Sequence, residues 1–341
     1  MVKILKNIKL AKYTTFHIGG KAEFFAEIRN VKALEEAVKF AKSKNLKIFT
    51  LGGGSNVLLP DSGLMGLVLK INIKGIKFKN DLVYVGAGEI WDKIVAKAVT
   101  KNLSGIENLS LIPGTVGGAI YQNIGAYGAE IKDVIESVDV FDIKLKKVKT
   151  LSNLSCRFSY RTSIFQKPEG KNYIILGTTL ELSPEFRPKI NYPDLAKYFE
   201  NKVPMIREVR KAVVQIRRTK LDYPTASIGT AGSFFKNPVI TVSKFQTLVS
   251  RHPDIIGRDL GNNQVKLFAG QLTEKTNWKG KRIGNVGVSK RHAMVLISYK
   301  GAKSRDIINL ARMMQKSVKV KFGIDLEPEV NLFDKLKVDP E

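Results

Sequence analysis

The pattern of hydrophobic and polar positions near the N-terminus predicts a small βαβ unit. Residues 24–28 (FFAEI) are mostly apolar, apolar side chains then recur at helical spacing from Val31 to Ala41, and residues 47–52 (KIFTLG) form a second short apolar run. Short apolar runs bounded by polar residues are typical of strands, and a spacing of three or four residues is typical of a helix with one buried face. We therefore expect a strand, a helix and a second strand in this order.

Further along, the pattern predicts more strands and three further helices. Short apolar runs occur at 67–71, at 82–86 and again through 134–150, and AMVLIS at 293–298 predicts a late strand. Helical spacing indicates helices over the ranges 90–101, 206–219 and 303–322, the last of which ends at Gly323.

Two irregular segments flank the second half of the chain. SPEFRPKINYP (183–193) holds three prolines, which suits an interdomain connection or a loop that covers a substrate, with Tyr192 near its end. LEPEV (326–330) leads into a segment in which alternation would place Glu327, Glu329 and Asn331 on one face of a strand. A carboxylate on an inward face is a candidate acid or electrostatic group, whereas an exposed edge strand is the alternative.

A glycine-rich segment at 111–128 (LIPGTVGGAIYQNIGAYG) is the strongest candidate for a ligand-binding loop. Its glycines lie among small and apolar residues rather than charged ones, with Gln122, Asn123 and Tyr127 between them. Glycine tolerates positive φ and has no side chain, so successive backbone N–H groups can be aimed at an anion or a ring edge. We interpret the segment as a loop that cradles a cofactor rather than as a tight turn buried between strands.

A second glycine-rich loop, Gly52–Asn56 (GGGSN), ends the second strand of the βαβ unit, where bound phosphates are common. It does not fit G-x-G-x-x-G, and an apolar stretch with Pro60 follows it instead of a helix, which argues against a nicotinamide-binding Rossmann fold. The N–H groups of residues 53–56 could bind a pyrophosphate as an anion nest, with a hairpin turn as the alternative.

Several polar side chains are candidates for chemistry. Arg161 lies between apolar residues in CRFSYRTSIF (156–165), where its burial would require a carboxylate or phosphate partner, unless it pairs with a surface acid. The helix over 206–219 delivers Lys220 into DYPTASIGTAGSFFKNP (222–238), which presents Ser233 and Asn237. No G-x-S-x-G motif or nearby histidine accompanies Ser233, so a hydrolase nucleophile is not expected.

Composition limits the class of protein. The chain has 341 residues with 57 basic and 31 acidic side chains, a net charge of +26, and 43% hydrophobic residues. The lysines are spread along the chain without a dense basic block or an RNA-binding motif, so nucleic acid is not an expected partner, although the positive field would attract nucleotide diphosphates. One cysteine excludes an internal disulfide, and no apolar run reaches the ~18 residues of a membrane span. No signal peptide is visible at the N-terminus, and we expect a cytoplasmic protein.

Six motifs occur together in the order and spacing of one family. They are TFHIGG (15–20), LGGGSNVLL (51–59), IPGTVGGAIYQNIGAYG (112–128), FSYRTS (158–163), AGSFFKNP (231–238) and LEPEV (326–330). In these motifs the chain closely resembles the MurB family of UDP-N-acetylenolpyruvoylglucosamine reductases, and the resemblance covers nearly all of it.

The resemblance implies an α+β fold with an FAD-binding domain of the p-cresol methylhydroxylase/vanillyl-alcohol oxidase type and a C-terminal α+β substrate-binding domain. The expected boundaries are 1–185 for the FAD domain, with subdomains of about 1–74 and 75–185, 186–205 for a connecting loop, 206–322 for the substrate domain, and 323–341 for a C-terminal strand that returns to the active site. FAD would be bound non-covalently and NADPH would reduce it. The expected cofactor-binding residues are Gly52, Gly53, Gly54, Ser55, Asn56, Gly114, Thr115, Gly117, Gly118, Ala119, Gln122, Asn123 and Gly125.

The resemblance also implies a reaction, reduction of enolpyruvyl-UDP-N-acetylglucosamine to UDP-N-acetylmuramate in peptidoglycan synthesis. Ser233 would donate a proton, while Arg161 and Glu329 would stabilise the charge that develops on the substrate. The substrate-contacting residues would be Tyr127, Tyr192, Lys220, Asn237 and, by a looser alignment, His292.

This sequence departs from the family pattern in two places. Asn331 stands where many members have an arginine, and Gln271 stands where a tryptophan is usual. We expect a monomer that binds no metal. The alternative is another flavoprotein of the same fold, such as an oxidase of small alcohols.

Overall fold

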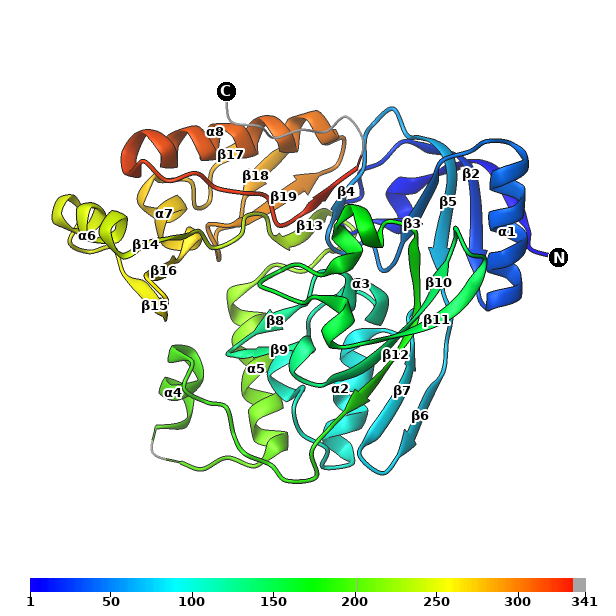
Figure 1. Ribbon diagram of the computed structural model, residues 1–341. Helices are drawn as coiled ribbons and strands as arrows, with labels where there is room; N and C mark the ends of the chain where they lie inside the picture. The colour runs from blue at the N-terminus through cyan, green and yellow to red at the C-terminus, as the bar shows by residue number, and fades with distance from the viewer. Residues whose placement is uncertain (201, 334–341) are drawn as a thin grey trace. The chain divides into compact units, whose positions relative to one another are not determined.

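The computed structural model describes residues 1–200 and 202–333, which divide into two compact units (Figure 1). Unit 1 comprises Met1–Ile8, Ala22–Gly54 and Leu64–Thr219, and unit 2 comprises Lys9–Lys21, Ser55–Gly63 and the chain from Lys220 onward. Two short N-terminal segments therefore belong to the same unit as the C-terminal part of the chain. The last eight residues of the expected C-terminal strand, 334–341, lie outside the described residues.

The N-terminal βαβ unit is confirmed, with one strand inserted. In unit 1, β2 (Lys21–Ile28) and β3 (Ile48–Leu51) both pair in parallel with β5 (Leu64–Ile71), and β1 (Ile4–Lys9) completes a sheet of order β1-β2-β5-β3. The connecting helix α1 (Val31–Ser43) begins after Asn30, whose side-chain oxygen accepts a hydrogen bond of 2.8 Å from the Ala33 N–H. The apolar face of α1 is buried, as its spacing predicts.

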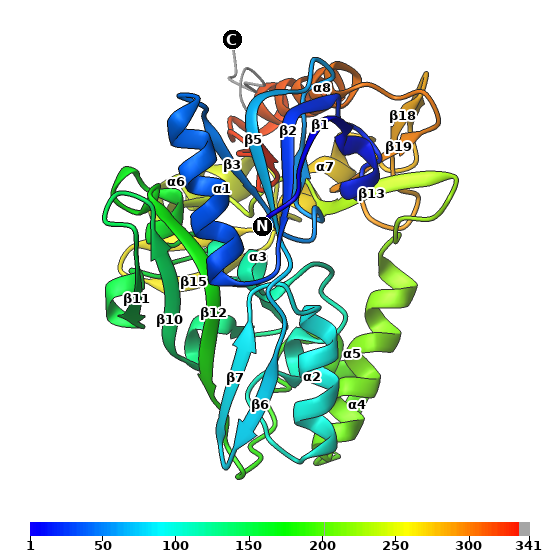
Figure 2. The same cartoon turned by 90° about the vertical axis from the view of Figure 1, so that its right-hand side faces the viewer.

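The second sheet of unit 1 is antiparallel throughout. Its order is β11 (Lys147–Ser152), β10 (Ile135–Asp142), β12 (Tyr173–Glu181), β7 (Leu82–Gly86) and β6 (Ile76–Lys79). Helix α2 (Trp91–Thr100) lies beside it (Figure 2) and contributes the fully buried Trp91, whose indole N–H donates to the Leu109 carbonyl at 2.9 Å. The glycine-rich segment follows and forms the short helix α3 (Val116–Tyr121) and the hairpin of β8 (Gly125–Ala126) and β9 (Ala129–Glu130).

Helix α5 (Ile206–Lys220) is joined to α2 by a half-buried ion pair. The Arg210 guanidinium donates to both carboxylate oxygens of Asp92, at 2.7 and 3.0 Å, and also to the Ser110 hydroxyl at 2.9 Å. Burial by itself raises the pKa of Asp92, but hydrogen bonds from Arg210 and from the Leu111 N–H outweigh it and hold that pKa below its usual value. Helix α4 (Pro193–Phe199) packs its buried Leu195 and Phe199 on the apolar face of α5.

We expect Asp92→Asn to lower the free energy of unfolding by about 2 kcal/mol at neutral pH, because it leaves a half-buried arginine without its carboxylate. The pKa of Asp92 is lower in the folded state than in the unfolded state. Its contribution is therefore complete above the unfolded-state pKa of about 4 and is lost as the pH falls through the folded-state value. Urea titrations should show the two proteins converging in acid.

Glu169→Gln is the matched control for this prediction. Glu169 forms an exposed pair with Arg157 at 3.8 Å, and such surface pairs contribute little to stability. An Asp92→Asn protein as stable as the parent at neutral pH would contradict the role assigned to the pair.

In the described part of unit 2, the chain forms two antiparallel sheets and three α-helices. One sheet has the order β13 (Ile228–Ser233), β19 (Val295–Tyr299), β18 (Val286–Val288), β17 (Arg282–Ile283), and the other the order β14 (Val239–Thr241), β16 (Gln264–Leu267), β15 (Gly257–Gly261). The helices are α6 (Val242–Arg251), α7 (Ala269–Lys275) and α8 (Ser304–Phe322). Helix α8 ends as predicted at Gly323, which has a φ of 66° and so forms a left-handed C-cap.

The segment after α8 differs from the sequence-based expectation. A strand with Glu327, Glu329 and Asn331 on one face was predicted, but the structure has only an isolated bridge between Pro328 and Phe235, followed by the two-residue strand β20 (Asn331–Leu332). β20 pairs in parallel with β4 (Val57–Leu58), which directly follows the GGGSN loop. Pro328 has no N–H to donate, which is incompatible with a continuous ladder at this point. Within the described residues, none of the helices combines the length and apolar character needed to cross a membrane.

Candidate functional site

The two glycine-rich segments of unit 1 lie directly against each other. A Cβ on Gly53 would come within 2.7 Å of the Gly114 Cα, and a Cβ on Gly52 within 2.9 Å of the Thr115 hydroxyl oxygen. The backbones can approach this closely only because these positions lack side chains. The side-chain amine of Lys70 on β5 donates to the Gly52 carbonyl and so orients the loop, and burial lowers the pKa of Lys70. Sequence reasoning did not identify Lys70.

Beside these two loops lie a buried hydroxyl without a hydrogen-bond partner in the described part of the chain and a glycine with open space next to it. The Thr115 hydroxyl is buried and has no hydrogen-bond partner among the described residues, although Thr115 directly precedes α3. Next along the helix, a Cβ on Gly118 would meet no protein atom within 4 Å. A buried hydroxyl without a partner is costly, so a ligand that supplied one would be stabilised here.

Arg161 is positioned against the same segment, near its C-terminal end at Gly125. Its guanidinium Nη2 donates to the Gly125 carbonyl at 2.6 Å, and a Cβ on Gly125 would lie 2.8 Å from Nη1. Arg161 has a φ of 55°, within a tight turn closed by backbone bonds between Ser159 and Thr162. Arg161 therefore lies at the glycine-rich segment, and both its backbone and its side chain are constrained.

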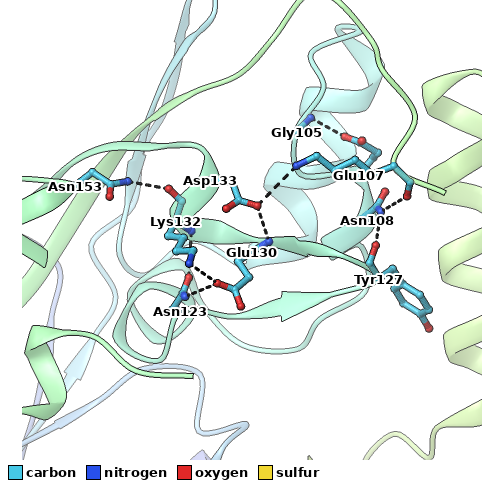
Figure 3. Close-up of polar contacts among 10 residues, drawn as sticks. Gly105, Glu107, Asn108, Asn123, Tyr127, Glu130, Lys132, Asp133 and Asn153 are labelled. Atoms are coloured by element: carbon cyan, nitrogen blue, oxygen red, sulfur yellow. Dashed lines mark hydrogen bonds and ion pairs between the residues drawn. The ribbon is translucent and has the colours of Figure 1, made fainter. Parts of the chain in front are cut away.

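The buried amide of Asn123 connects these two segments. Its Nδ2 donates to a Glu130 carboxylate oxygen at 2.9 Å, and its oxygen accepts from the Lys132 N–H at 3.2 Å (Figure 3). Nδ2 also donates to the Ser159 carbonyl at 2.9 Å. Both the NH₂ group and the oxygen of this amide are thus bonded to the protein. The assignment of Asn123 to the cofactor stays a prediction, and in this structure its side chain positions the turn that carries Arg161.

Other expected cofactor residues have mainly structural contacts in unit 1. Ala119 is buried in the core, and the Gly117 N–H donates to the Ala87 carbonyl at 2.9 Å. Gln122 directly follows α3, and Gly54 has a φ of 70°, which favours glycine there.

Ser233 and Glu329 are brought together within unit 2. Ser233 ends β13 after an irregularity in the pairing with β19, where Gly232 has a φ of 74°. The next residue, Phe234, accepts a backbone hydrogen bond of 2.7 Å from the Glu329 N–H. Both Ser233 and Glu329 are half-buried, whereas Phe234 and Phe235 are fully buried and anchor the strand end. The fold thus positions a hydroxyl and a carboxylate on adjacent backbone segments.

The end of the GGGSN loop is attached to the Glu329 segment. The Asn56 side-chain amide donates to the Glu329 carbonyl at 3.1 Å, and the Asn56 carbonyl accepts from both the backbone and the side-chain amide of Asn331, at 3.0 and 3.1 Å. Asn331, one of the departures from the family pattern, is therefore used to fasten this loop. The other departure, Gln271, is satisfied locally by hydrogen bonds with Asp254 and Ile256.

A basic cluster in unit 2 contains three of the substrate candidates, Lys220, Asn237 and His292. His292 packs near Gly270 at the start of α7, where the Ala269 N–H donates to the Asn237 side-chain oxygen at 3.0 Å. Burial lowers the pKa of His292, and the positive charge of Lys220 lowers it further. Because the His292 Nδ1 accepts from the Met294 N–H at 3.3 Å, the neutral ring carries its proton on Nε2 and can donate it to a ligand.

The loop that carries His292 is held by a contact that sequence reasoning missed. The fully buried Ser289 donates to the Asp222 carboxylate, and its hydroxyl oxygen accepts from the N–H groups of Arg291 and His292, at 2.9 and 3.1 Å. Asp222 follows Lys220 by two residues, so this contact joins the segments that carry Lys220 and His292. Neither residue lies in a recognisable motif.

Tyr127 and Tyr192, the other two substrate candidates, are in contact within unit 1. Their rings meet edge to face with centroids 5.2 Å apart. Tyr192 directly precedes α4, and Tyr127 has a φ of 48° in the turn between β8 and β9.

Comparison with known proteins gives full-length matches. A family model for the C-terminal domain of UDP-N-acetylenolpyruvoylglucosamine reductase matches residues 223–333, and a model described as an FAD binding domain matches residues 22–150. A UDP-N-acetylenolpyruvoylglucosamine reductase from Flavobacterium johnsoniae is 40% identical, covering 97% of this chain and 100% of the relative, and one from Neisseria meningitidis serogroup A is 41% identical over 94% of this chain and 95% of the relative. The crystal structure of UDP-N-acetylenolpyruvylglucosamine reductase (MurB) from Thermus caldophilus aligns over 97% of this chain and 98% of its own, with 25% identity and a TM-score of 0.68.

Proposed function

The chain belongs to the UDP-N-acetylenolpyruvoylglucosamine reductase family, and we infer from this that it reduces enolpyruvyl-UDP-N-acetylglucosamine to UDP-N-acetylmuramate in peptidoglycan synthesis, with FAD as cofactor and NADPH as reductant. The observation that carries this conclusion is 40% identity over the whole length of a relative of that name. The expected fold class is also confirmed, because the FAD-binding and C-terminal family models both match and a structure of the family aligns over nearly the full chain.

We call the two apposed glycine-rich loops of unit 1, residues 52–54 and 114–118, the cradle. The cradle has the features that a flavin nucleotide requires. Backbone N–H groups at Gly53 and Gly54 would face the pyrophosphate, the unpartnered Thr115 hydroxyl would donate to a cofactor oxygen, and the absence of a side chain at Gly118 leaves room beside the helix. FAD, when bound, supplies hydride to the enol-ether carbon distal to the substrate carboxylate. Non-covalent binding fits this donor set, because its members offer hydrogen bonds rather than a nucleophile.

Ser233 is assigned the proton that completes the reduction. Adding hydride to the distal carbon leaves negative charge on the carbon next to the carboxylate, and this carbon takes the proton of the Ser233 hydroxyl. A hydroxyl is a weak acid, but a carbanion-like carbon is a strong base, so the transfer is favourable if the geometry is held. The bulged end of β13 and the backbone bond between Phe234 and Glu329 support this assignment by restricting Ser233.

Arg161 and Glu329 are assigned to charge stabilisation at the substrate carboxylate. The guanidinium supplies positive charge to the enolate-like species, and its hydrogen bond to Gly125 holds it in place without neutralising it. Glu329 acts as a hydrogen-bonding partner next to Ser233, on the segment that Asn56 fastens.

The nucleotide part of the substrate is assigned to two groups of residues. Lys220 provides a cation for the diphosphate, and the neutral His292 ring and the Asn237 amide provide hydrogen bonds beside it. Tyr127 and Tyr192 provide aromatic contact surface in unit 1. We further propose a monomer that acts in the cytoplasm, where NADPH and nucleotide-linked sugars are available, and that does not bind nucleic acid.

The decisive experiment combines a spectrum with a turnover assay. The purified protein should show the visible absorbance of bound flavin, and its oxidation of NADPH should depend on added enolpyruvyl-UDP-N-acetylglucosamine. A yellow protein that oxidises NADPH at the same rate with and without the enolpyruvyl nucleotide would exclude the assignment, and so would a colourless one. UDP-N-acetylglucosamine, which lacks the enolpyruvyl group, is the control ligand.

We expect Gly118→Ala to weaken FAD binding without destabilising the fold. The added methyl group meets no protein atom within 4 Å and replaces glycine in a helix, so the apoprotein should be unchanged or slightly more stable, by up to about 1 kcal/mol. FAD would have to accommodate the methyl group, so its dissociation constant should rise. Flavin titration of the apoprotein and thermal unfolding separate the two effects.

Gly53→Ala is the contrasting variant. Its Cβ would collide with the Gly114 backbone, so the apoprotein itself should lose about 1–3 kcal/mol of stability. Unchanged FAD affinity in Gly118→Ala would show that FAD does not lie beside this position.

A further inference from the structure

The connection between β12 and α4 is fastened at its first end by Ser104. We call residues 183–192 the strap; they form neither helix nor regular strand. Backbone bonds of 2.8 and 3.0 Å join Ser104 and Ser183 in both directions, and the Ser104 hydroxyl donates to the Ser183 or the Glu185 carbonyl, at 3.0 and 2.9 Å. The strap therefore leaves the sheet along a defined path and ends at Tyr192.

Asn108 makes a second attachment, at the middle of the strap. It lies in the 3-10 helix Glu107–Leu109 and is only 1% exposed. Its side-chain amide donates to the Lys189 carbonyl of the strap and to the Tyr127 carbonyl of the glycine-rich segment, both at 2.8 Å (Figure 3). One buried amide thus joins the two segments that carry the substrate-contacting tyrosines.

The orientation of this amide is unambiguous. Both groups it faces are carbonyl oxygens, so the NH₂ end must point towards them, and its own oxygen has no hydrogen-bond partner among the described residues. The Lys189 side chain adds only a weak, half-exposed pair with Asp133 at 3.8 Å. Asn108 is therefore the buried polar link between the strap and the backbone of Tyr127.

We propose that Asn108 is a positioning residue for the nucleotide, which holds the strap against the glycine-rich segment and thereby sets the edge-to-face contact of Tyr127 and Tyr192. This inference rests on the proposed function, because the two tyrosines are assigned to the substrate there. Both tyrosines lie within three residues of a carbonyl held by Asn108, so release of the amide removes an attachment close to each ring. The apparent affinity for the substrate equals the intrinsic affinity multiplied by the fraction of molecules in which the rings are correctly placed. It therefore falls as that fraction falls.

Asn108→Asp tests the proposal, since it keeps the size of the side chain and replaces its NH₂ donor with a carboxylate oxygen that faces two carbonyls. We expect the KM for the enolpyruvyl nucleotide to rise by about 10- to 100-fold, with little change in kcat or in the rate at which NADPH reduces the bound FAD. Asn102→Asp, the same exchange at an exposed position after α2, is the control and should match the parent.

A second readout does not depend on activity. Trypsin should cleave after Lys189 faster in FAD-loaded Asn108→Asp than in the parent or in Asn102→Asp, because cleavage requires the strap to detach locally. Cleavage and KM unchanged from the parent would overturn the proposal, and so would faster cleavage with an unchanged KM. Failure of the parent to turn over the enolpyruvyl nucleotide would overturn the proposed function, while the cleavage result would still show whether Asn108 holds the strap.

Asn108→Ala covers the case in which the aspartate variant does not fold. It removes both hydrogen bonds without adding charge and leaves room for water at the two carbonyls. KM and the cleavage rate should change in the same directions but by smaller factors. A flavin-loaded Asn108→Ala protein that behaves like the parent in both measurements would reject the proposal.

Discussion

Replacing Ser233 with alanine should slow reoxidation of the reduced flavin by the enolpyruvyl nucleotide by about 10²- to 10⁴-fold, the usual size of a general-acid contribution. Reduction of FAD by NADPH should continue at nearly the parental rate, because that half-reaction requires no proton from the serine hydroxyl. Stopped-flow measurement of flavin absorbance follows the two half-reactions separately. Ser233→Ala should retain FAD and fold normally, since Ser233 is only half-buried and its neighbours Phe234 and Phe235 supply the buried contacts.

Ser227→Ala is the matched control for this prediction. Ser227 is exposed in the segment that leads into β13, and within residues 1–200 and 202–333 its hydroxyl is bonded only to the Thr225 hydroxyl. It should behave like the parent in both half-reactions. Equal losses in the two half-reactions of Ser233→Ala would instead mean that the serine supports FAD or the fold, and the proton-donor role would have to be given up.

Substitution of Arg161 by lysine should reduce the same oxidative half-reaction by about 10²-fold, although the positive charge is kept. The planar guanidinium presents its N–H donors as a rigid fork, and the donor on Nη2 bonds the Gly125 carbonyl. A lysine ammonium has three donors at a single point and cannot reproduce this fork. Arg161→Met, which removes the charge as well, should cost more than Arg161→Lys.

Arg157→Lys tests whether any exchange in this loop is harmful. Arg157 is exposed, and the ion pair it makes with Glu169 is a surface contact at 3.8 Å, so turnover should be unchanged. If Arg161→Lys reacts as fast as the parent while Arg161→Met is slow, charge alone matters and the directional role assigned to the guanidinium is wrong.

Local elements were predictable because their signals are local. The apolar faces of α1, α5 and α8 repeat every three or four residues, and the Gly323 cap lies at the end of its own helix, so a short window contains the necessary information. The prediction of a strand around Glu329 was wrong for a related reason. Alternation was visible, but pairing depends on a neighbouring strand and on N–H groups that Pro328 lacks.

The candidate site shows the same division between local sequence signals and contacts that depend on distant residues. Motif order singled out Arg161, Ser233 and Glu329, whose roles stay predictions, and glycine density singled out both loops of the cradle. Assignment of Asn123 to the cofactor rested on its position in a glycine-rich segment, whereas its side chain is buried and bonded to Ser159 and Glu130. Which way a side chain faces depends on the turn that carries it, and a motif does not encode that.

The amino-acid sequence by itself determined the family, the reaction class and the location of the periodic helices, since these follow from residue types and their spacing along the chain. Only the tertiary structure decided that β5 lies between β2 and β3, that Asn56 fastens the Glu329 segment, and that Asn108 and Ser289 hold the loops of the substrate candidates. These contacts join segments far apart in sequence, and those outside the sheet depend on a few hydrogen bonds. Such bonds form only when the loop path and the strand register are already set, so no local sequence pattern predicts them.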